Sequence, residues 1–335
     1  MAAPGRPPTM EDVAAAAGVS RALVSLVMRG SPKVSEARRQ AVLDAAERLQ
    51  YRPNAMARGL ASSRTMTIGV LLNDLHNPFF ADIAGGIEAL ASELGYQLLL
   101  GTGRRRPERE RTVVSSFADY RVDGLILVSP RFDEDALVSA ASRIPTVVIG
   151  RELEAPEFDT VVIDEPLGVR AVVSYLAGLG HRDILHVTGG DGAGAAARVA
   201  CFHAAMEAAG LGPGRTLPGD FTEEAGVRAA QTILTRGELP TAVFAANDLT
   251  AAGMMDTFLR GGIRIPADVS LVGYDNIYIA ELRQLSLTTV DQPRQTMGRQ
   301  ALELLIERIE GRQERVTRIV EPTLVVRDTA GRVRQ

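Results

Sequence analysis

The stretch TMEDVAAAAGVSRALVSLVMRGSPKVSEARRQAVLDAAERLQYRP, residues 9–53, decides the fold of the first part of the chain. Thr9 and Asp12 have the spacing of a capping box, which marks the start of a helix. Apolar residues follow at helical spacing up to a turn at Gly18, namely Met10, Val13, Ala14 and Ala17. The segment therefore opens with a short amphipathic helix.

Two more helices follow directly. Ser20 caps the second helix and Gly30 ends it, while Ser35 caps the third. The second helix has an apolar side formed by Val24, Val27 and Met28. Its opposite side carries Arg21, Ala22, Ser25 and Arg29. The third helix has a buried stripe of Val42, Ala45 and Leu49. A helix, a tight glycine turn and a second helix with small and basic residues on its outer side predict a helix-turn-helix unit, whose second helix fits the major groove of DNA.

Positive charge is concentrated in the same part of the chain. Residues 1–65 contain ten Arg or Lys and five Asp or Glu, a net charge of +5. Since the whole chain carries −4, the remainder carries −9. A basic head on an acidic body suits a polyanionic partner at one end only, although a solvated basic face gives the same pattern. Combined with the helix pattern, the charge favours double-stranded DNA as a partner over a helical bundle without one.

The segment NAMARGL, residues 54–60, is a helix candidate of about two turns that contains Gly59. It is far shorter than the ~12 to 15 residues at which isolated helices become marginally stable, and glycine weakens it further. We therefore expect it to become helical only against a partner. A plain flexible linker is the alternative, and residues 62–65 are linker in either case.

From Thr67 onward, short apolar runs alternate with helical stretches. The runs are TIGVLL, YQLLLGT, DGLILVS, PTVVIG, TVVID, DILHVTG, TAVFAA and VSLVGY. Runs of this kind separated by crossover helices predict parallel sheets covered on both faces, and about 250 residues of them exceed what one sheet usually holds. We therefore predict an all-α helix-turn-helix headpiece and an α/β core of two doubly wound parallel-sheet lobes.

These patterns also predict the domain boundaries. Near the C-terminus, TTVDQP, a helix from about 294 to 310 and RIVEPTLVV are expected to return the chain between the lobes. The predicted domains are a DNA-binding domain (1–52), a hinge helix with linker (53–65) and an effector-binding and dimerisation domain (66–335). In the last domain we expect lobe one at about 66–163 and 291–321, and lobe two at about 164–290 and 322–330.

Composition points to the cytoplasm. No apolar run approaches the ~20 residues that span a bilayer, so we expect no membrane association. The N-terminus lacks the apolar stretch of a secretory signal, and the single cysteine, Cys201, cannot form an internal disulfide. Cys201 lies among apolar helical residues, where we expect an inert thiol.

Ligands of open α/β sheets bind at the carboxyl ends of the strands, which selects a set of candidate residues. Those just beyond the apolar runs are Asn73, Asp74, Ser129, Arg151, Gly189, Asn247, Asp248 and Asp275. Their amide, carboxylate, hydroxyl and guanidinium groups can hydrogen-bond several hydroxyls at once. A sugar or a polyol is therefore the expected small-molecule partner.

Catalytic and cofactor motifs are weak by comparison. The turn GDGAGA, residues 190–195, fits the G-x-G-x-x-A dinucleotide fingerprint, but no acid ends the next strand to bind a ribose. The four histidines lack metal-ligand spacing, and no nucleophile elbow or Walker motif occurs. We expect no catalytic residue, metal or cofactor. An NAD-linked enzyme with an accessory DNA-binding domain and a solute-binding transport component are the weaker alternatives, the second because it needs a signal peptide and no DNA-binding unit.

The stretch from Asp12 to Ile83 resembles the opening of the lactose-repressor (LacI/GalR) family of bacterial transcription regulators. The later blocks GHRDILHVTG, ARVACF, GDF, FAANDLTAAG, VSLVGYDN and TTVDQP match that family too, so the resemblance covers essentially the whole chain. It implies a periplasmic-binding-protein-like core and an effector-responsive regulator, expected to repress carbohydrate or polyol utilisation genes from a near-palindromic operator. A nucleobase or another metabolite is the alternative effector.

The resemblance also implies the DNA contacts. They are Ser20, Arg21, Ala22, Ser25, Leu26, Arg29, Lys33, Ser35, Asn54, Ala57, Arg58 and Leu60. Arg21, Ala22 and Ser25 are expected to read base edges, while residues 54–60 match the hinge helix that inserts leucine into the minor groove. At Leu26 and Arg29 the chain departs from the arginine and asparagine common in the family, so the family's operator cannot be carried over.

For the effector, the resemblance adds aromatic and basic residues to the strand-end set. The predicted contacts are Asn73, Asp74, Phe79, Phe80, Ser129, Arg151, Arg198, Phe221, Asn247 and Asp275. Gly150, Glu165 and Cys201 replace the aspartate, asparagine and glycine that family members often carry, so the ligand is not inherited either. Since no leucine heptads follow Val326, a homodimer is expected rather than a tetramer.

Overall fold

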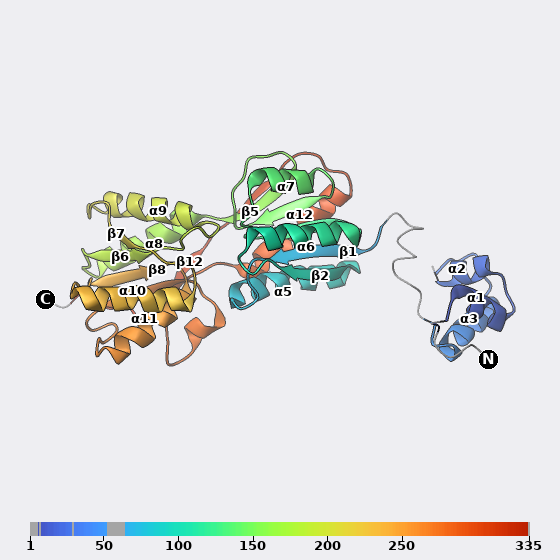
Figure 1. Ribbon diagram of the computed structural model, residues 1–335, viewed down its shortest axis with the longest axis horizontal. Helices are drawn as coiled ribbons and strands as arrows, with labels where there is room; N and C mark the ends of the chain where they lie inside the picture. The colour runs from blue at the N-terminus through green and yellow to red at the C-terminus, as the bar shows by residue number, and fades with distance from the viewer. Residues whose placement is uncertain (1–5, 7, 29, 52–63, 334–335) are drawn as a thin grey trace. The chain divides into compact units, whose positions relative to one another are not determined.

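The computed structural model describes residues 6, 8–28, 30–51 and 64–333. The chain divides into two compact units, Met1–Thr65 and Met66–Gln335 (Figure 1). The first is helical and the second consists of two sheets with their covering helices. Among the described residues no helix is long and apolar enough to cross a membrane.

The first unit is a three-helix bundle. It comprises α1 (Met10–Ala17), α2 (Arg21–Met28) and α3 (Glu36–Arg48). The capping box forms, since Thr9 Oγ1 accepts from Asp12 N and Asp12 Oδ2 accepts from Thr9 N, and Gly18 ends α1 at a φ of 65°. Ser20 Oγ accepts from Leu23 N, as the sequence predicts. Ser35 precedes α3 but makes no capping hydrogen bond with its side chain. The small core of this unit contains Val13, Val24, Val27, Val42 and Ala45.

Lobe one is a six-stranded sheet in the order β11-β5-β4-β3-β1-β2, in which every pair is parallel. Its strands are β1 (Thr67–Leu72), β2 (Gln97–Thr102), β3 (Gly124–Val128), β4 (Thr146–Ile149), β5 (Phe158–Ile163) and β11 (Thr317–Val320). The helices on one face are α5 (Pro78–Leu94) and α12 (Arg294–Ile309), and those on the other are α6 (Pro107–Asp119) and α7 (Glu134–Ala141).

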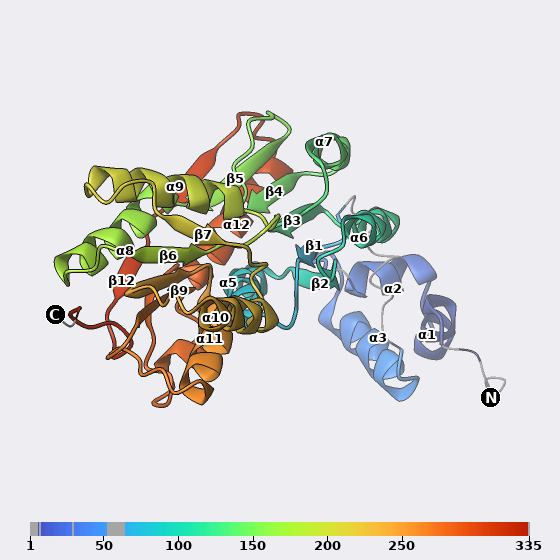
Figure 2. The ribbon, with the colours of Figure 1, turned by 60° about the vertical axis from the view of Figure 1, so that its left-hand side comes forward.

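Lobe two is a second six-stranded sheet, in the order β12-β10-β9-β8-β6-β7, where only β12 runs antiparallel. Its strands are β6 (Ile184–Val187), β7 (Arg215–Leu217), β8 (Ala242–Ala245), β9 (Ser270–Asp275), β10 (Thr288–Asp291) and β12 (Thr323–Val325). One face carries α8 (Glu165–Gly178) and α9 (Ala195–Ala208), and the other carries α10 (Glu223–Arg236) and α11 (Asp248–Arg260) (Figure 2). A 3-10 helix, η1 (Tyr278–Glu281), follows β9.

The predicted fold class is confirmed, with one strand that the sequence pattern missed. All eight apolar runs coincide with strands. In the interior strands this follows from burial on both faces, which demands continuous hydrophobicity, whereas β2 is an apolar run at the edge of its sheet. Strand β7 has three residues, of which Arg215 and Thr216 are exposed. An edge strand of this kind needs no apolar run, which explains why periodicity failed to find it.

The chain passes between the lobes three times. Strand β5 belongs to lobe one and leads into α8 of lobe two, β10 leads back into α12, and β11 leads into β12. The carboxyl ends of β5 and β10 therefore lie at crossing points. Polar residues at strand ends of both lobes can consequently face one another.

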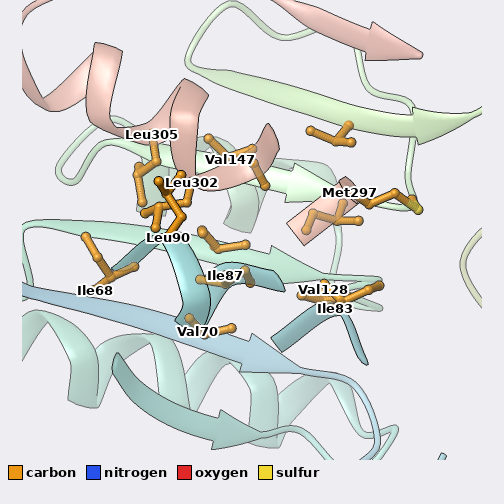
Figure 3. Close-up of a cluster of buried hydrophobic side chains, with 14 of the residues drawn as sticks. Ile68, Val70, Ile83, Ile87, Leu90, Val128, Val147, Met297, Leu302 and Leu305 are labelled. Atoms are coloured by element: carbon orange, nitrogen blue, oxygen red, sulfur yellow. The ribbon is translucent and has the colours of Figure 1, made fainter. Parts of the chain in front are cut away.

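Figure 3 shows the main core of lobe one, where α5 and α12 pack on the sheet. Ile83, Ile87 and Leu302 are fully buried there. Glycines permit the close approach of the two helices, since a Cβ on Gly86 would lie 2.1 Å from the carbonyl oxygen of Gln295 and one on Gly298 would lie 2.2 Å from that of Ile83.

This contact predicts opposite outcomes for two neighbouring glycines of α5. Gly86→Ala should destabilise the core by about 1 to 3 kcal/mol, because the added methyl group meets backbone that must move. Gly85→Ala is the matched control, since a Cβ there meets nothing within 4 Å and alanine favours a helix by about 1 kcal/mol. Urea unfolding followed by circular dichroism measures both. Equal stability of the two variants would contradict the proposed helix contact.

Candidate functional site

The outer side of α2 is the candidate DNA-reading surface. Val24 and Val27 are buried in the bundle, and Leu23, Leu26 and Met28 are partly buried against the same core, so Arg21 and Ala22 are the exposed positions of α2. Ser20, Arg21, Ala22, Lys33 and Ser35 are exposed, while Ser25 and Leu26 are partly buried. The Arg21 guanidinium lies 3.7 Å from the Glu11 carboxylate, and both side chains are about 70% exposed (69% and 72%). An exposed pair of this kind is weak, so Arg21 is free to exchange Glu11 for another anion.

Five predicted DNA contacts lie outside the described residues. They are Arg29, Asn54, Ala57, Arg58 and Leu60. Their assignment remains a prediction from the sequence.

The second unit contains a cavity of about 400 Å³, formed by loops at the strand ends of both lobes. It collects nine of the ten predicted effector contacts, namely Asn73, Asp74, Phe79, Phe80, Ser129, Arg198, Phe221, Asn247 and Asp275. Lobe one supplies Asn73 and Ser129 from the ends of β1 and β3, and lobe two supplies Asp275 from the end of β9. Residues that follow strand ends far apart in the sequence therefore meet at one cavity, as expected for ligand sites of open α/β sheets.

Arg151 is the residue that the structure does not bring into the cavity. Its Nη1 donates to the carbonyl oxygen of Phe132 at 2.8 Å, and it is absent from the described lining. The residue follows Gly150, whose φ of 78° turns the chain at the end of β4. Gly150 itself lines the cavity, so the chain reaches the site one residue earlier than expected.

Phe221 forms an aromatic wall that depends on two glycines. A Cβ on Gly189 would lie 2.1 Å from its ring, and one on Gly192 would lie 2.6 Å from it. Phe221 adopts a φ of 67°, and Asn247 Nδ2 donates to its carbonyl oxygen at 3.1 Å. The glycine-rich turn that mimics a dinucleotide fingerprint therefore provides room for this ring.

Asn73 and the two adjacent phenylalanines line the lobe-one side of the cavity. Asn73 is buried, and its Oδ1 has no hydrogen-bond partner among the described residues. Asn77 caps α5 by accepting from Phe79 N, which places Phe79 and Phe80 in the first turn, with their rings 5.3 Å apart in an edge-to-face arrangement. This side offers a hydrogen-bond acceptor beside an apolar surface, which suits a ligand that combines hydroxyls with a hydrophobic face.

Arg198 and Glu165 form a buried ion pair in the cavity. Arg198 Nε donates to Glu165 Oε1 at 2.6 Å, and its guanidinium stacks 3.7 Å from the centroid of the Tyr274 ring. Burial alone would lower the pKa of Arg198, but the Glu165 carboxylate outweighs it and raises that pKa. The arginine is therefore a permanent cation.

Asp275 is a second buried carboxyl group at this site. Gln292 Nε2 donates to its Oδ1 at 2.6 Å. Burial raises the pKa of Asp275 to about 7, against the attraction of Arg198 and Arg294. Burial and the neighbouring Asp275 also raise the pKa of Asp248 well above its usual value, although Thr289 and the backbone N–H of Ile277 donate to it.

Two arginines bridge the lobes at the cavity, and the sequence analysis missed both. Arg105, after β2, donates to the Asp220 carbonyl oxygen at 2.5 Å, and Arg131, after β3, forms an ion pair with Asp191. Both arginines line the cavity and belong to lobe one, whereas both acids belong to lobe two. Extending the strand-end rule by two or three residues would have found them.

Arg294 makes a third link, at the start of α12. Its Nε donates to Asp82 of α5 at 2.8 Å, its Nη2 donates to the Asn276 carbonyl oxygen at 2.8 Å, and its Nη1 donates to the Asp275 carbonyl oxygen. It therefore ties lobe one to the end of β9, next to the cavity.

No group of three or more potential metal ligands occurs within residues 6, 8–28, 30–51 and 64–333. Cys201 is partly buried, and burial raises the pKa of its thiol. A raised pKa disfavours the reactive thiolate.

Comparison with known proteins supports the same architecture. The profile of the bacterial regulatory proteins of the lacI family matches residues 9–54, and that of periplasmic binding protein-like domains matches residues 173–330. The HTH-type transcriptional repressor PurR of Vibrio campbellii is 34% identical over 327 residues, which covers 96% of this chain and 98% of the relative. The HTH-type transcriptional regulator CelR of Thermobifida fusca is 38% identical, with 97% and 98% covered.

Solved structures agree. The lac repressor dimer bound to operator and the anti-inducer ONPF matches with a TM-score of 0.88 at 28% identity, over 97% of this chain and 100% of that one. The complex of the transcriptional regulator CelR with cellobiose matches with a TM-score of 0.73 at 35% identity, over 96% and 100%.

A helix-turn-helix unit joined to a two-lobed, periplasmic-binding-protein-like core defines a DNA-binding transcription regulator. The chain belongs to the LacI family, as its sequence resemblance predicts. Regulators of this family are not enzymes, so the NAD-linked alternative is rejected.

The buried Asp275 predicts a pH-dependent stability. Because its pKa rises from 3.8 to about 7 on folding, the native state holds an extra proton between these values and loses stability as pH rises through them. Asp275→Asn should remove this loss, so the unfolding temperature of the variant should rise relative to that of the wild type as the pH increases from about 4 to about 7. Thermal unfolding at constant ionic strength tests this, with Glu223→Gln as a control for losing an exposed charge of the same cavity. Parallel profiles for wild type and Asp275→Asn would refute the assignment.

Proposed function

We propose that the chain is a repressor that binds a near-palindromic operator as a homodimer and responds to a small neutral ligand, a sugar or a polyol. The observation that carries this proposal is the cavity between the two lobes, lined by both polar and aromatic side chains, in a chain whose other unit exposes Arg21 and Ala22 on α2. The domain ranges 1–52, 53–65 and 66–335 are the proposed reader, hinge and sensor.

The reading of DNA is proposed to rest on Arg21, Ala22 and Ser25. An arginine can donate to both acceptors of a guanine edge, and small neighbours let the helix approach the groove closely. Lys33 and Ser35 lie beyond α2, where they would contact phosphates and set the register. The similarity to the solved structure of a lac repressor dimer bound to operator supports this proposal.

Homodimerisation is supported by an uncovered edge of lobe one. Strand β2 is an edge strand in which no residue is fully buried, and Leu100 on it is half exposed. A long exposed edge with apolar side chains is unfavourable in water unless it is covered. A second copy would cover it and would bring two reader units to the two halves of an operator.

The link between ligand and DNA is proposed to be a change in the angle between the lobes. Residues 53–65 lead into β1 of lobe one, so a movement of lobe one relative to lobe two would alter the spacing of the two hinges in a dimer. The pairs Arg105 with Asp220 and Arg131 with Asp191 join the lobes at the cavity, where a ligand would add contacts to both. Such coupling is reciprocal and typically worth about 1 to 3 kcal/mol.

The proposal of a sugar or polyol rests on the polar groups of the cavity, and the similarity to CelR, whose solved complex contains cellobiose, supports it. A nucleobase is the second candidate, because Phe79, Phe80 and Phe221 all line the cavity and aromatic rings stack on planar ligands.

Reversing the charge of Arg21 tests the reader. Arg21→Glu should weaken binding to the preferred site, selected from a random DNA library, by more than about tenfold, because it removes a base contact and repels phosphates. Arg48→Glu, an exposed residue at the end of α3, makes the same charge change away from α2. Fluorescence anisotropy at fixed salt measures both. Wild-type affinity in Arg21→Glu would refute this role, and a loss of equal size in the control would show that only net charge matters.

A thermal-shift screen of sugars, polyols and nucleobases tests the sensor. A true ligand stabilises the folded state, by about 2.7 kcal/mol at a hundredfold excess over Kd, and so raises the unfolding temperature. It should also change the affinity for the selected DNA site, and Phe221→Ala should abolish the thermal shift. Should every stabilising ligand leave DNA affinity unchanged, the proposal of a ligand-responsive repressor would fail.

A further inference from the structure

The Arg198–Glu165 pair lies in the wall of the cavity and is almost fully buried. Arg198 is 6% exposed and Glu165 is 9% exposed, and both line the cavity. Glu165 is the first residue of α8, where a helix favours negative charge. Arg198 lies in the first turn of α9, where positive charge is disfavoured. The arginine therefore depends on its carboxylate partner.

Glu165 occupies the Nε–Nη2 edge of Arg198, which is one of the edges through which an arginine binds an anion with two N–H groups. Arg198 Nε donates to Glu165 Oε1 at 2.6 Å and Nη2 donates to Oε2 at 3.3 Å, while Nη1 donates to the Ala246 carbonyl oxygen at 2.5 Å. Two parallel N–H donors are how arginine binds a carboxylate or a phosphate. The chain's own carboxylate already fills that place, and of the five guanidinium N–H groups two remain for other acceptors.

The other charged residues of the cavity also disfavour an anionic ligand. Arg105 and Arg131, the two further arginines of the lining, are paired with Asp220 and Asp191. The lining also contains the carboxyl groups of Asp74, Glu223 and Glu224, which form no ion pair with these arginines among the described residues. An anionic ligand would therefore meet arginines that are already neutralised and an excess of acids. A neutral ligand could still accept from Arg198 and donate its hydroxyls to the carboxylates.

We propose that Glu165 is a specificity-determining residue that masks Arg198 and restricts the cavity to neutral, polyhydroxylated ligands, excluding sugar acids and sugar phosphates. This inference rests on the proposed ligand-binding function of the cavity and names the class of ligand. The sequence pattern alone could not reveal it, because Glu165 is noticed there only as a departure from the family's usual asparagine.

Removing the charge of Glu165 should expose an anion site. The probes are inorganic phosphate and D-gluconate, used on the full chain at constant ionic strength. Glu165→Gln keeps the shape of the side chain but leaves the charge of Arg198 uncompensated, so phosphate should stabilise this variant in a saturable way, with a Kd at least about tenfold below that of the wild type. Glu224→Gln removes a negative charge from the same cavity without touching Arg198, and should gain nothing.

A second variant separates this effect from a general loss of negative charge. In the double variant Glu165→Gln with Arg198→Gln, the gain for phosphate and gluconate should disappear. The role of Arg198 would be overturned if Glu224→Gln gained as much affinity for phosphate as Glu165→Gln. It would also be overturned if the double variant kept the gain of Glu165→Gln. If Glu165→Gln folds but gains no anion affinity, the masking role of Glu165 is wrong.

The wild-type protein provides a test that needs no variant. Matched pairs such as D-galactose with D-galacturonate and D-glucose with D-glucuronate or D-glucose 6-phosphate keep the same pyranose ring and differ mainly in one anionic group. Thermal shifts should favour the neutral member of any pair that binds. A preference for an anionic member would overturn the inference about Glu165 but would leave the proposed regulator intact. If instead Glu165→Gln binds phosphate while no ligand changes the affinity for DNA, the inference about Glu165 stands and the proposed ligand-responsive regulator fails.

Discussion

Burial of both faces of two sheets, one parallel and one parallel except for β12, is the constraint on which the structure depends. Parallel strands are joined by crossover helices that cover the faces, so the polar side chains that can meet a ligand lie where the strands end. The chain crosses from one lobe to the other after β5, β10 and β11, so the strand ends of both lobes meet at one cavity. The location of the site follows from the way the hydrophobic core is covered.

Close packing then determines which side chains can form the wall of that cavity. The Phe221 ring occupies space that any residue other than glycine at 189 or 192 would fill. Asn247 caps α11 by accepting from Thr250 N and simultaneously donates to the Phe221 carbonyl oxygen. One residue thus starts a helix and positions the aromatic wall, which couples the local order of α11 to the shape of the site.

Electrostatics in the cavity is dominated by pairs formed within the chain. Arg198 with Glu165, Arg131 with Asp191 and Arg105 with Asp220 satisfy most of the positive charge before any ligand arrives. Two of these pairs join the lobes, and one lies within lobe two. Ion pairs therefore serve two purposes in this unit. The two pairs between the lobes help to fix the position of one lobe relative to the other, and the buried pair is proposed to determine which ligands bind. The reader unit is different, because Arg21 on α2 is exposed and can exchange its partner.

The sequence by itself determined the elements and the composition of the site. Apolar runs located eight strands, Thr9 and Ser20 located helix starts, and strand-end positions located Asn73, Asn247 and Asp275, because each of these depends on local pattern or on the direction of a strand. Only the tertiary structure decided partnership: that Arg151 turns to Phe132, that Arg131 reaches Asp191, and that Glu165 binds Arg198 across 33 positions of chain. Such pairings depend on how two lobes are brought together, and no local propensity encodes the distance between residues far apart in the chain.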